Sequence, residues 1–468
     1  MTAPTMSLTP QWVQQAILYH IFPLGALGAE IRNPWVSDDT SRPPLHRIRD
    51  LVRWIPHLQQ MGVNTLLLGP IWNSESHGYD TVELGQPDPR LGSREDYKWT
   101  FSQFKKNGFR LVLDAVFNHV GRHFPKFQSI LQLKQQSPWK HWFSGLDFKP
   151  GSPYGDDVFY DTWDGHWKLV KLRLDQSEVR QYLLDQVGQW IAEYEIDGLR
   201  LDAADTIDPA FWPLLRSHTS TIKPDFWLFG EQVFGDYRNI AGPQSLHGTT
   251  NYECYKGFWS SANETNMHEV AHSLKRQYQD PGIYNDLVLV NFLDNHDVDR
   301  IASKMRVPSR LYPLHILLLT LPGVPALYYG SEFGLLGTKE KTSDWPLRPH
   351  LDPAGMHLQG TQPNLPQEIQ RLTTLRYNFP ALTQGSYREI GVGPDWLVFE
   401  RTLHDQTVVV AISISPNPQS QTIALPKNGC WKDVLNGDTF EAESSQDGKA
   451  SKLVISIPAC WGRVLLKE

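Results

Sequence analysis

The sequence predicts an α/β protein: a (β/α)8 barrel with an inserted domain after the third strand and a C-terminal antiparallel β-sandwich. Three observations support this prediction. Eight short apolar runs occur between residues 16 and 330, and most are separated by stretches with helical spacing of apolar residues. Alternation of strands and helices is typical of a parallel sheet, and eight such units favour a closed barrel. From about residue 380, the pattern changes to short strands of alternating polarity.

The eight apolar runs are the candidate barrel strands, and the sixth is the weakest. They are AILYHIF (16–22), VNTLLLGPIW (63–72), FRLVLDAVF (109–117), IDGLRLDAA (196–204), FWLFGEQVF (226–234), TTNYECY (249–255), DLVLVNFLDN (286–295) and VPALYYG (324–330). Between them lie helix-like patterns such as LVRWIPHLQQMG (51–62) and VRQYLLDQVGQWIAEY (179–194). An open doubly wound sheet would need a glycine-rich phosphate loop after the first strand, and IFPLGALGAE does not have the GxGxxG spacing.

One connection is too long for a plain loop. Between FNHVG (117–121) and the helical run that starts at 179 lie about sixty residues rich in Trp, Phe, Pro, Gly and Asp. We interpret this segment as a small domain that lies over the C-terminal face of the barrel. The predicted boundaries are 1–120 and 175–378 for the barrel, 121–174 for the inserted domain B, and 379–468 for the β-sandwich.

The composition limits the kinds of partner. The 468 residues are 40% hydrophobic and 20% charged, with a net charge of −7, as in an ordinary globular protein. An acidic chain disfavours nucleic acid or an anionic membrane as the main partner. Aromatic residues reach 12%, which suits a flat sugar ring, although core packing accounts for most aromatic side chains. Three cysteines, Cys254, Cys430 and Cys460, lie far apart without metal-binding spacing.

The compartment is predicted from the same features. The N-terminal stretch lacks a basic region followed by an apolar run, and no segment reaches membrane-spanning length. The widely spaced cysteines fit free thiols in a reducing compartment. We therefore expect a cytoplasmic protein.

Three carboxylates directly follow strand-like runs. They are Asp202 in GLRLDAAD (198–205), Glu231 in LFGEQ (228–232) and Asp297 in FLDNHD (292–297). Active-site residues of a (β/α)8 barrel lie at the C-terminal ends of its strands. Arg200 stands two residues before Asp202 and shares a face with it in an extended strand. The other polar candidates at strand ends are His77, Tyr79, Asp80, Asp114, Asn118, His119, His296 and Arg300.

This set of groups fits the hydrolysis of a glycosidic bond with retention of configuration. That reaction uses two carboxyl groups about 5–5.5 Å apart, a nucleophile and an acid/base. The nucleophile must be ionised, and a neighbouring guanidinium such as Arg200 lowers the pKa of a carboxyl such as Asp202. The acid must be protonated, which the apolar strand end around Glu231 favours. Asp297 would hold ring hydroxyls and, by repulsion, help to keep Glu231 protonated.

The motifs resemble those of the α-amylase superfamily, the retaining glycoside hydrolases that act on α-glucans. DAVFNH (114–119), GLRLDAAD, GEQ (230–232) and FLDNHD resemble its four signatures in the right order. HGYD (77–80), LVKLRLD (169–175) and PGVPALYYGSEFG (322–334) are further matches, so the resemblance covers nearly the whole chain. It implies a TIM barrel in which Asp202 is the nucleophile, Glu231 the acid/base and Asp297 the stabiliser of the transition state.

The resemblance also implies roles for the remaining polar candidates. Tyr79 would stack on the sugar before the scissile bond, and His119 and His296 would hydrogen-bond its hydroxyls. His77 and Arg200 are further substrate-binding candidates, whereas Asp80 and Asp114 would orient Tyr79, Arg200 and the strand ends. Without the motifs, each histidine would be interpreted as a core imidazole with its hydrogen bonds satisfied. Arg300 fits either a pocket wall or a surface salt bridge.

Two departures from the family pattern concern the substrate and a metal. Starch-cleaving members carry Lys-His after the nucleophile, where this chain has Asp205 and Thr206, so a standard endo-α-amylase is in doubt. Asn118 matches a position that often binds calcium in the family. Calcium takes six to eight oxygen ligands, and the acids of the inserted segment show no recognisable loop pattern. No cofactor is expected to be required, and Ca²⁺ bound by Asn118 is the open alternative.

The leading hypothesis is an enzyme that cleaves α-1,4-glucosidic bonds in maltooligosaccharides, cyclodextrins or starch-derived dextrins through a covalent glycosyl-Asp202 intermediate. YDTWDGHW (160–167) resembles a stretch of the cyclodextrin- and maltodextrin-degrading branch, although packing of a small domain also explains it. An α-glucan transferase or a trehalose-synthase-like isomerase would use the same intermediate. A non-catalytic barrel that binds a glycan or a partner protein is the third alternative, and such relatives typically lose carboxylates that this chain keeps. The oligomeric state stays open.

Overall fold

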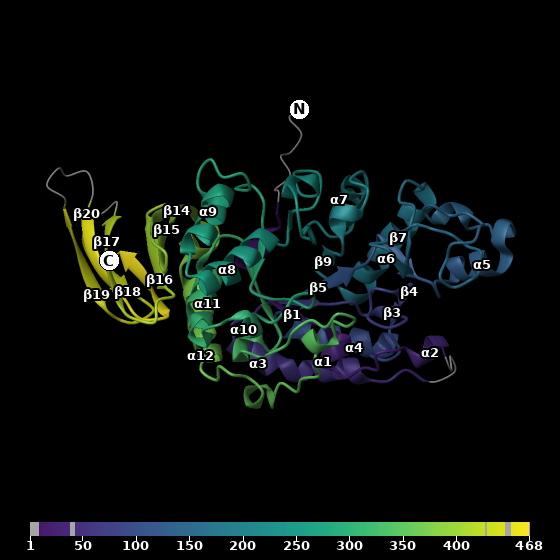
Figure 1. The fold of residues 1–468 in the computed structure, drawn as a ribbon, viewed down its shortest axis with the longest axis horizontal. Helices are drawn as coiled ribbons and strands as arrows, with labels where there is room; N and C mark the ends of the chain where they lie inside the picture. The colour runs from purple at the N-terminus through teal and green to yellow at the C-terminus, as the bar shows by residue number, and fades with distance from the viewer. Residues whose placement is uncertain (1–8, 38–42, 426–427, 445–450, 468) are drawn as a thin grey trace.

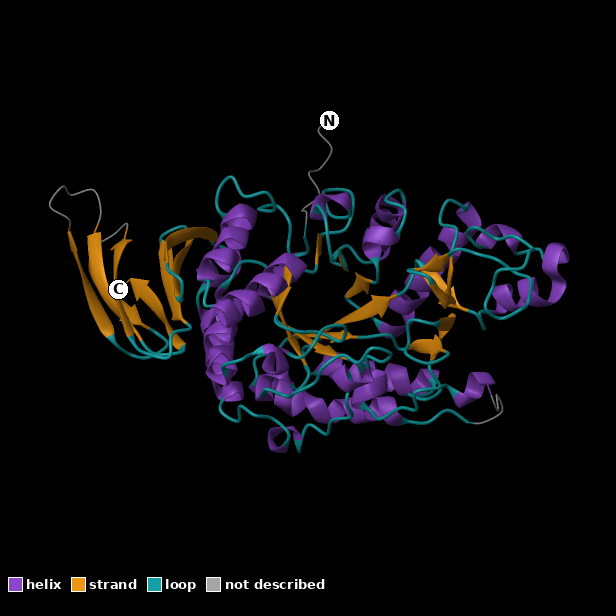
Figure 2. Cartoon of the chain, in the orientation of Figure 1, coloured by secondary structure: helices purple, strands orange, loops and turns teal. Residues whose placement is uncertain are grey.

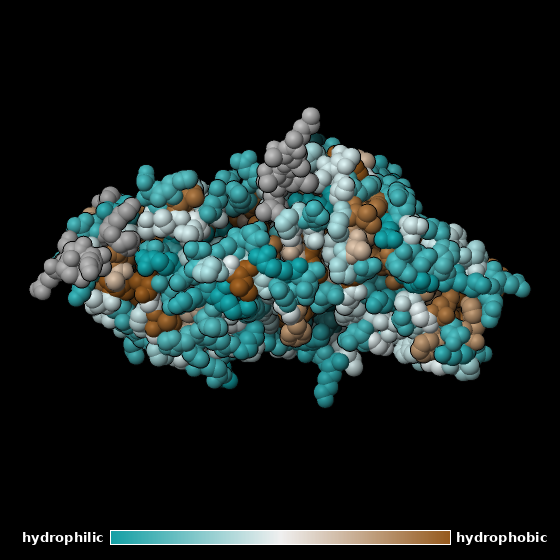
Figure 3. All heavy atoms as spheres, turned by 90° about the horizontal axis from the view of Figure 1, so that it is seen from above, coloured by the Kyte–Doolittle hydropathy of each residue, from teal (hydrophilic) through white to brown (hydrophobic). Residues whose placement is uncertain are grey.

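The computed structural model describes residues 9–37, 43–425, 428–444 and 451–467. The barrel lies in the middle of an elongated molecule, with the C-terminal sheet at one end and the inserted segment at the other (Figure 1). The face seen in Figure 3 is mostly hydrophilic, and its hydrophobic atoms form small separate patches. Within the described ranges, no helix has the length and apolar character needed to cross a membrane.

Eight parallel strands form the barrel, in the order β11-β10-β9-β5-β2-β1-β13-β12. A parallel bridge between Thr250 and Val290 joins the two ends of this order and closes the barrel. The strands are β1 (Leu18–Ile21), β2 (Thr65–Leu68), β5 (Arg110–Ala115), β9 (Gly198–Leu201), β10 (Trp227–Gly230), β11 (Gly248–Thr249), β12 (Val290–Phe292) and β13 (Val324–Tyr328). Each overlaps one of the eight predicted runs, so the predicted barrel is confirmed.

The sixth strand is shorter than predicted. Only Thr249 of the run 249–255 belongs to β11, because the helix α8 (Tyr252–Glu264) begins three residues later. The Asn251 side chain accepts a hydrogen bond from the backbone N–H of Cys254 and so caps this helix. A local helix cap therefore ends the strand in a stretch whose aromatic and β-branched residues favour extended structure.

Helices surround the strands, as Figure 2 shows. They are the 3-10 helix η2 (Arg47–Trp54), α3 (Ile55–Gln60), α4 (Arg94–Lys106), α6 (Ser177–Tyr194), α7 (Phe211–Ile222), α8, α9 (Met267–Tyr278), α11 (Leu311–Thr320) and α12 (Leu365–Asn378). The α4 helix shows why they form: Ser93 and Asp96 make a capping box at its start, and Tyr97, Phe101 and Phe104 lie on its buried face. The predicted helix 51–62 is 3-10 in its first third.

The inserted segment follows β5 and contains a three-stranded antiparallel sheet in the order β6-β8-β7. Its elements are β6 (His119–Gly121), the helix α5 (Pro125–Leu133), β7 (Thr162–Trp163) and β8 (His166–Lys171). The ring of Phe127 on α5 packs edge-on against Phe143 and Tyr160. Because β6 begins at His119, the insertion starts at the end of a barrel strand.

The C-terminal strands form one antiparallel sheet in the order β14-β15-β16-β21-β18-β19-β20-β17. They are β14 (Ser386–Val392), β15 (Trp396–Leu403), β16 (Gln406–Ser413), β17 (Gln419–Leu425), β18 (Gly429–Asp433), β19 (Thr439–Ser444), β20 (Ser451–Ile457) and β21 (Trp461–Lys467). The outermost strands β14 and β17 contact each other, so the sheet folds over a core that includes Val409, Trp431 and Ile455. This confirms the predicted antiparallel C-terminal unit.

The close approach of Gly248 in β11 to the backbone of Val288 predicts how an added methyl group changes the stability of the protein. A Cβ atom on Gly248 would lie 1.7 Å from the carbonyl oxygen of Val288, a backbone atom that cannot move freely. We expect Gly248→Ala to lower the free energy of unfolding by about 3 kcal/mol, the upper range for overpacking. Urea unfolding measures this change. Gly242→Ala is the matched control because a Cβ there meets no atom within 4 Å; equal stability of the two variants would contradict the prediction.

Candidate active site

The barrel register brings two of the predicted carboxylates together. In the ladder between β9 and β10, Leu201 lies beside Gly230, and Asp202 and Glu231 are the next residues. The ladder continues past the strand ends, since the backbone N–H of Glu231 donates to the carbonyl of Leu201 at 2.9 Å. The side chains of Asp202 and Glu231 are 11% and 12% exposed, so both carboxylates are largely buried. Asp202 and Glu231 therefore lie side by side at the C-terminal end of the barrel.

Arg200 holds this pair and a third carboxylate. One terminal nitrogen of its guanidinium, Nη1, lies 3.1 Å from Asp202 Oδ1 and 2.8 Å from both oxygens of Asp114. The other, Nη2, lies 2.7 Å from Glu231 Oε1. The Arg200 side chain is only 4% exposed, so these contacts are shielded from water. The contact between Arg200 and Asp202 that the sequence predicted is present, and Arg200 also contacts Asp114 and Glu231.

Sharing Arg200 changes the electrostatics expected for Asp202. Burial raises the pKa of this carboxyl, Arg200 opposes the rise, and repulsion from Glu231 and Asp114 adds to it. The pKa of Asp202 consequently lies above its ordinary value, whereas the sequence suggested that Arg200 would lower it. One guanidinium serving three carboxylates cannot offset their burial and mutual repulsion. The crowding of three carboxylates around one guanidinium therefore sets the affinity of Asp202 for a proton.

Asp297 has the opposite electrostatic environment. Its side chain is 32% exposed, and its oxygens lie 2.9 Å from His296 Nε2 and 3.0 Å from Arg348 Nη2. Burial raises the pKa of Asp297, but His296 and Arg348 outweigh this effect, so the pKa lies below its ordinary value. The Asn295 side chain accepts a hydrogen bond from the Asp297 backbone N–H at 2.8 Å. Asp297 is thus held as an ionised carboxylate.

Tyr79 and His296 form an aromatic wall beside these carboxylates. Their rings stack with centroids 5.5 Å apart and an interplanar angle of 11°, and the Tyr79 hydroxyl is hydrogen-bonded to His296 Nε2. The same hydroxyl donates to Asp114 Oδ2 at 2.9 Å. Asp114 therefore links Tyr79 to Arg200, the position expected for a residue that orients both.

His119 presents a neutral ring at the start of the insertion. Its Nδ1 accepts a hydrogen bond from the Asn118 side-chain amide at 3.2 Å, so Nε2 carries the hydrogen. Nε2 has no hydrogen-bond partner among the described residues. Burial lowers the pKa of His119 to about 3, so the ring is neutral at ordinary pH. His119 can therefore donate one N–H to a ligand.

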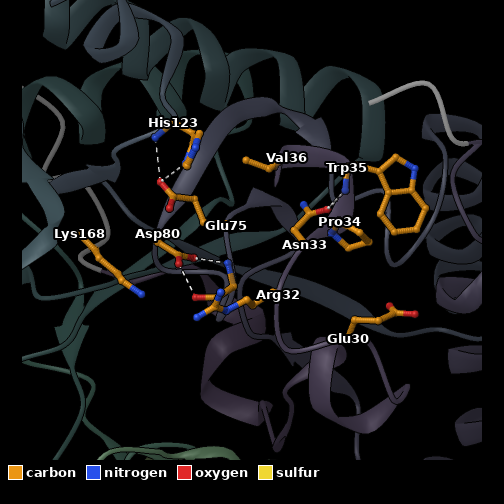
Figure 4. Close-up of a pocket in the computed structure, with 11 residues that line it drawn as sticks. Glu30, Arg32, Asn33, Pro34, Trp35, Val36, Glu75, Asp80, His123 and Lys168 are labelled. Carbon is orange, nitrogen blue, oxygen red and sulfur yellow. Dashed lines mark hydrogen bonds and ion pairs between the residues drawn. The ribbon is translucent and has the colours of Figure 1, made fainter. Parts of the chain in front are cut away.

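Asp80 of the HGYD loop (77–80) lines a cavity of about 570 Å³ (Figure 4). Asp80 is fully buried and accepts hydrogen bonds from the Ser76 backbone and hydroxyl. His77 is partly exposed; its Nδ1 accepts from the Tyr79 backbone N–H at 3.3 Å, and its Nε2 lies 3.7 Å from Asp80 Oδ2. The other residues that line the cavity include Arg32, Trp35, Glu75, His123 and Lys168, and none of the three catalytic candidates. Asp80 thus fixes the loop that carries Tyr79.

Arg300 does not reach the cluster. Its side chain is fully buried and donates hydrogen bonds to the carbonyls of Tyr329 at 2.6 Å and Leu347 at 2.9 Å. Its guanidinium also lies over the ring of Tyr328. Arg300 is therefore neither a pocket wall nor a surface ion pair, and both interpretations from the sequence are wrong. The arginine that contacts Asp297 is Arg348.

Three residues of the site were missed by the sequence analysis. The Tyr252 hydroxyl donates to Glu231 Oε1 at 3.0 Å and accepts from the Asn295 amide at 3.0 Å. Asn295 lies inside the FLDNHD motif, which could have drawn attention to it. Tyr252 was assigned to a strand, and Arg348 lies 51 residues beyond Asp297, outside every motif.

The residues around Asn118 do not fit a calcium ion. Asn118 Oδ1 has no hydrogen-bond partner in the described chain, which leaves one oxygen free for a metal. Calcium requires six to eight oxygens, and the described residues contain no group of three or more His, Cys, Asp and Glu that could hold a metal ion. The cavity next to Asn118 is also lined by a lysine, Lys171.

The YDTWDGHW stretch (160–167) contains residues of two kinds: one borders the site, and another packs inside the insertion. The Trp163 ring lies 5.8 Å from the ring of His119, beside the site. Tyr160 packs against Phe127 inside the insertion, with ring centroids 4.9 Å apart. One aromatic residue of the stretch therefore borders the site, and another packs the inserted segment.

Comparisons with known proteins agree with this architecture. Residues 48–346 match the family model "Alpha amylase, catalytic domain", and residues 391–466 match "Alpha amylase, C-terminal all-beta domain". The chain is 29% identical to a cyclomaltodextrinase of Geobacillus thermopakistaniensis over 97% of this chain and 77% of that protein. It is 30% identical to the intracellular maltogenic amylase of Bacillus subtilis over 86% of this chain and 68% of that protein.

Solved structures show the same fold over nearly the whole chain. A debranching enzyme from Nostoc punctiforme superposes with a TM-score of 0.78 at 26% identity, covering 98% of this chain and 99% of that one. A cyclic α-maltosyl-(1→6)-maltose hydrolase from Arthrobacter globiformis superposes equally well at 22% identity over the same shares. Because the catalytic-domain model matches more than half of this chain, the chain belongs to the α-amylase family of glycoside hydrolases.

Proposed function

We propose that this chain cleaves α-1,4-glucosidic bonds in maltooligosaccharides, cyclodextrins or starch-derived dextrins, with retention of configuration. The observation that carries the proposal is the guanidinium of Arg200, which contacts Asp202 and Glu231 through its two terminal nitrogens. Two carboxyl groups that contact one guanidinium are compatible with the short separation that retaining enzymes use. The cyclomaltodextrinase and maltogenic amylase among the relatives support the substrate class.

The reaction follows from the charges of the pair. Asp202 attacks the anomeric carbon while Glu231 transfers a proton to the glycosidic oxygen, so the leaving sugar departs as an alcohol. The resulting glycosyl ester of Asp202 is then attacked by water, from which Glu231 takes a proton. The cycle requires Asp202 to be ionised, and its contact with Arg200 favours that form.

The surrounding groups suit the sugar that is attacked. Tyr79 offers a ring for stacking, and the free Nε2–H of His119 is a donor for a hydroxyl. Asp297, held ionised by its contacts with Arg348 and His296, accepts hydrogen bonds from hydroxyls as the ring flattens. A cytoplasmic location is part of the proposal and is supported by the name of the Bacillus subtilis relative, an intracellular enzyme.

Replacing the nucleophile tests the core of this proposal. We expect Asp202→Asn to lower kcat/KM on maltotriose by at least about 10³-fold, because an amide cannot form the glycosyl ester. Release of reducing sugar measures the rate. Asp185→Asn, an exposed aspartate on α6, is the matched control and should keep full activity. Unchanged turnover of Asp202→Asn would show that the nucleophile is misassigned.

Proton NMR of the first product tests the retention of configuration. Two displacements at the anomeric carbon should release the new reducing end as the α-anomer, before mutarotation produces the β-anomer. Initial release of the β-anomer would contradict a glycosyl-Asp202 intermediate and indicate single displacement by water.

The contact between Arg348 and Asp297 predicts a change in pH dependence. Arg348 helps to hold the pKa of Asp297 below its ordinary value, so Asp297 stays ionised as the pH falls. In Arg348→Met, Asp297 should take up a proton at higher pH, moving the acid limb of kcat/KM upward by about one pH unit. Arg53→Met breaks an exposed ion pair with Asp352 and serves as the control. An acid limb that stays in place in Arg348→Met would rule out this role.

One observation favours transfer to a sugar as a second activity. The Phe234 side chain, three residues after Glu231, is 83% exposed. The buried Gln232 amide donates to the carbonyls of Phe234 and Asp236, both at 2.9 Å, and so fixes the loop. Because the loop that carries Phe234 starts at Glu231, which protonates the leaving oxygen, its exposed aromatic ring offers a platform for a sugar on the leaving-group side. A sugar held there intercepts the glycosyl ester in place of water.

Truncation of this ring separates transfer from hydrolysis. Phe234→Ala should lower the ratio of products longer than maltotriose to glucose and maltose by about fivefold to tenfold, because the acceptor loses its stacking surface. Turnover of α-maltosyl fluoride, which has no sugar on the leaving side, should be preserved. Val454→Ala, an exposed truncation in the C-terminal sheet, controls for general effects. An unchanged product ratio would exclude Phe234 from acceptor binding.

A further inference from the structure

A cavity of about 380 Å³ lies where the insertion meets the barrel. Asn118 borders it at the end of β5, Lys171 at the end of β8, and the segment 205–209 after β9. It contains none of the three catalytic carboxylates. It therefore belongs to the junction between the two parts of the chain.

Asn118 brings an unsatisfied acceptor to this cavity. The residue is 1% exposed; its amide nitrogen donates to His119, and its backbone carbonyl accepts from the Leu172 N–H at 3.0 Å. Its side-chain oxygen, Oδ1, has no partner in the described chain. Buried carbonyl oxygens are almost always hydrogen-bonded, so this oxygen calls for a donor inside the cavity.

Lys171 brings an unpaired donor. Its backbone is fixed on both sides, since its N–H donates to the Asp161 carbonyl and its carbonyl accepts from Ser144, each at 3.0 Å. In the sheet it pairs with His119, the neighbour of Asn118. Among the described residues, its ammonium makes no ion pair and no hydrogen bond, although the side chain is partly buried. An acceptor and a donor, both unpaired, thus line the same cavity.

The opposite wall carries negative charge. Asp205 is in the segment after the nucleophile, and within the described ranges its carboxylate has no cationic partner closer than 4.0 Å. The cation of this cavity is therefore on the insertion side and the anion on the barrel side. Opposite charges across a cavity attract, and a second cation would be repelled by Lys171.

We propose that the ammonium of Lys171 takes the place of a calcium ion at this junction. Turned toward Asn118 Oδ1, this unpaired ammonium would donate to it, neutralise Asp205 and so join the insertion to the barrel. An ammonium has three donors on a flexible four-carbon stem, which suits one amide oxygen and one carboxylate where calcium would need six to eight oxygens. By fixing the Asn118 amide, Lys171 also keeps Nε2–H of His119 free for a ligand. Lys171 is then a positioning residue.

Thermal unfolding of the full chain with EDTA or with millimolar calcium tests the proposal. The melting temperature of the wild type should be the same in both. Lys171→Met keeps the stem without the charge, and should melt several degrees lower with no response to calcium. Lys171→Asp adds a carboxylate beside Asn118 Oδ1 and Asp205, and should be destabilised in EDTA but stabilised by calcium in proportion to the logarithm of its concentration. Lys140→Asp, at an exposed lysine of the insertion, should show no calcium response.

Three results would overturn the proposal. A wild type that calcium stabilises would show that the cavity takes the metal beside Lys171. A Lys171→Met variant that melts like the wild type would show that the ammonium contributes nothing. A Lys171→Asp variant that is indifferent to calcium would show that the cavity is not a cation site, and this result holds even where Lys171→Met fails to fold. None of these measurements depends on the proposed catalytic activity.

Discussion

The guanidinium of Arg200 is the interaction on which the site depends. It lies at the end of β9 and holds carboxylates from β5, β9 and from the end of β10, so three neighbouring strands converge on one charge. Three carboxylates packed this closely and almost without water would repel one another strongly without a cation between them. The parallel register brings these carboxylates together, because adjacent strands place equivalent residues at the same height in the barrel. The arrangement of Asp202 and Glu231 is thus a product of barrel geometry and one shared counter-charge.

A consequence of this sharing is that the carboxylates differ in their affinity for a proton. Asp202 lies in the crowded group, where burial and repulsion raise its pKa, while Asp297 lies outside it between His296 and Arg348, where its pKa falls. The cation beside each carboxylate and the number of carboxylates that it serves account for the difference.

The sequence predicted the site residues that directly follow strands, and it missed those whose position depends on loops or on the direction of a side chain. Strand ends carry Asp202, Glu231 and Asp297 because apolar runs stop there, and this is readable from periodicity. Arg300 was misplaced because closeness in sequence to Asp297 does not fix side-chain direction; α10 (Ile301–Lys304) begins directly after it, and its side chain turns into the core. Arg348 comes from a loop beyond β13, and no periodicity connects it to Asp297. The helix cap at Asn251 similarly hid Tyr252.

The shortness of β11 has a dynamic meaning. Two residues form the strand, and the seam to β12 rests on contacts such as the Asn251 N–H to Val290 carbonyl bond at 2.9 Å and the Val288 N–H to His247 carbonyl bond at 3.3 Å. Local opening begins where backbone pairing is sparsest. The hydrogen-bond chain from Asn295 through Tyr252 to Glu231 spans this seam. Glu231 is therefore hydrogen-bonded across the part of the barrel where backbone pairing is sparsest.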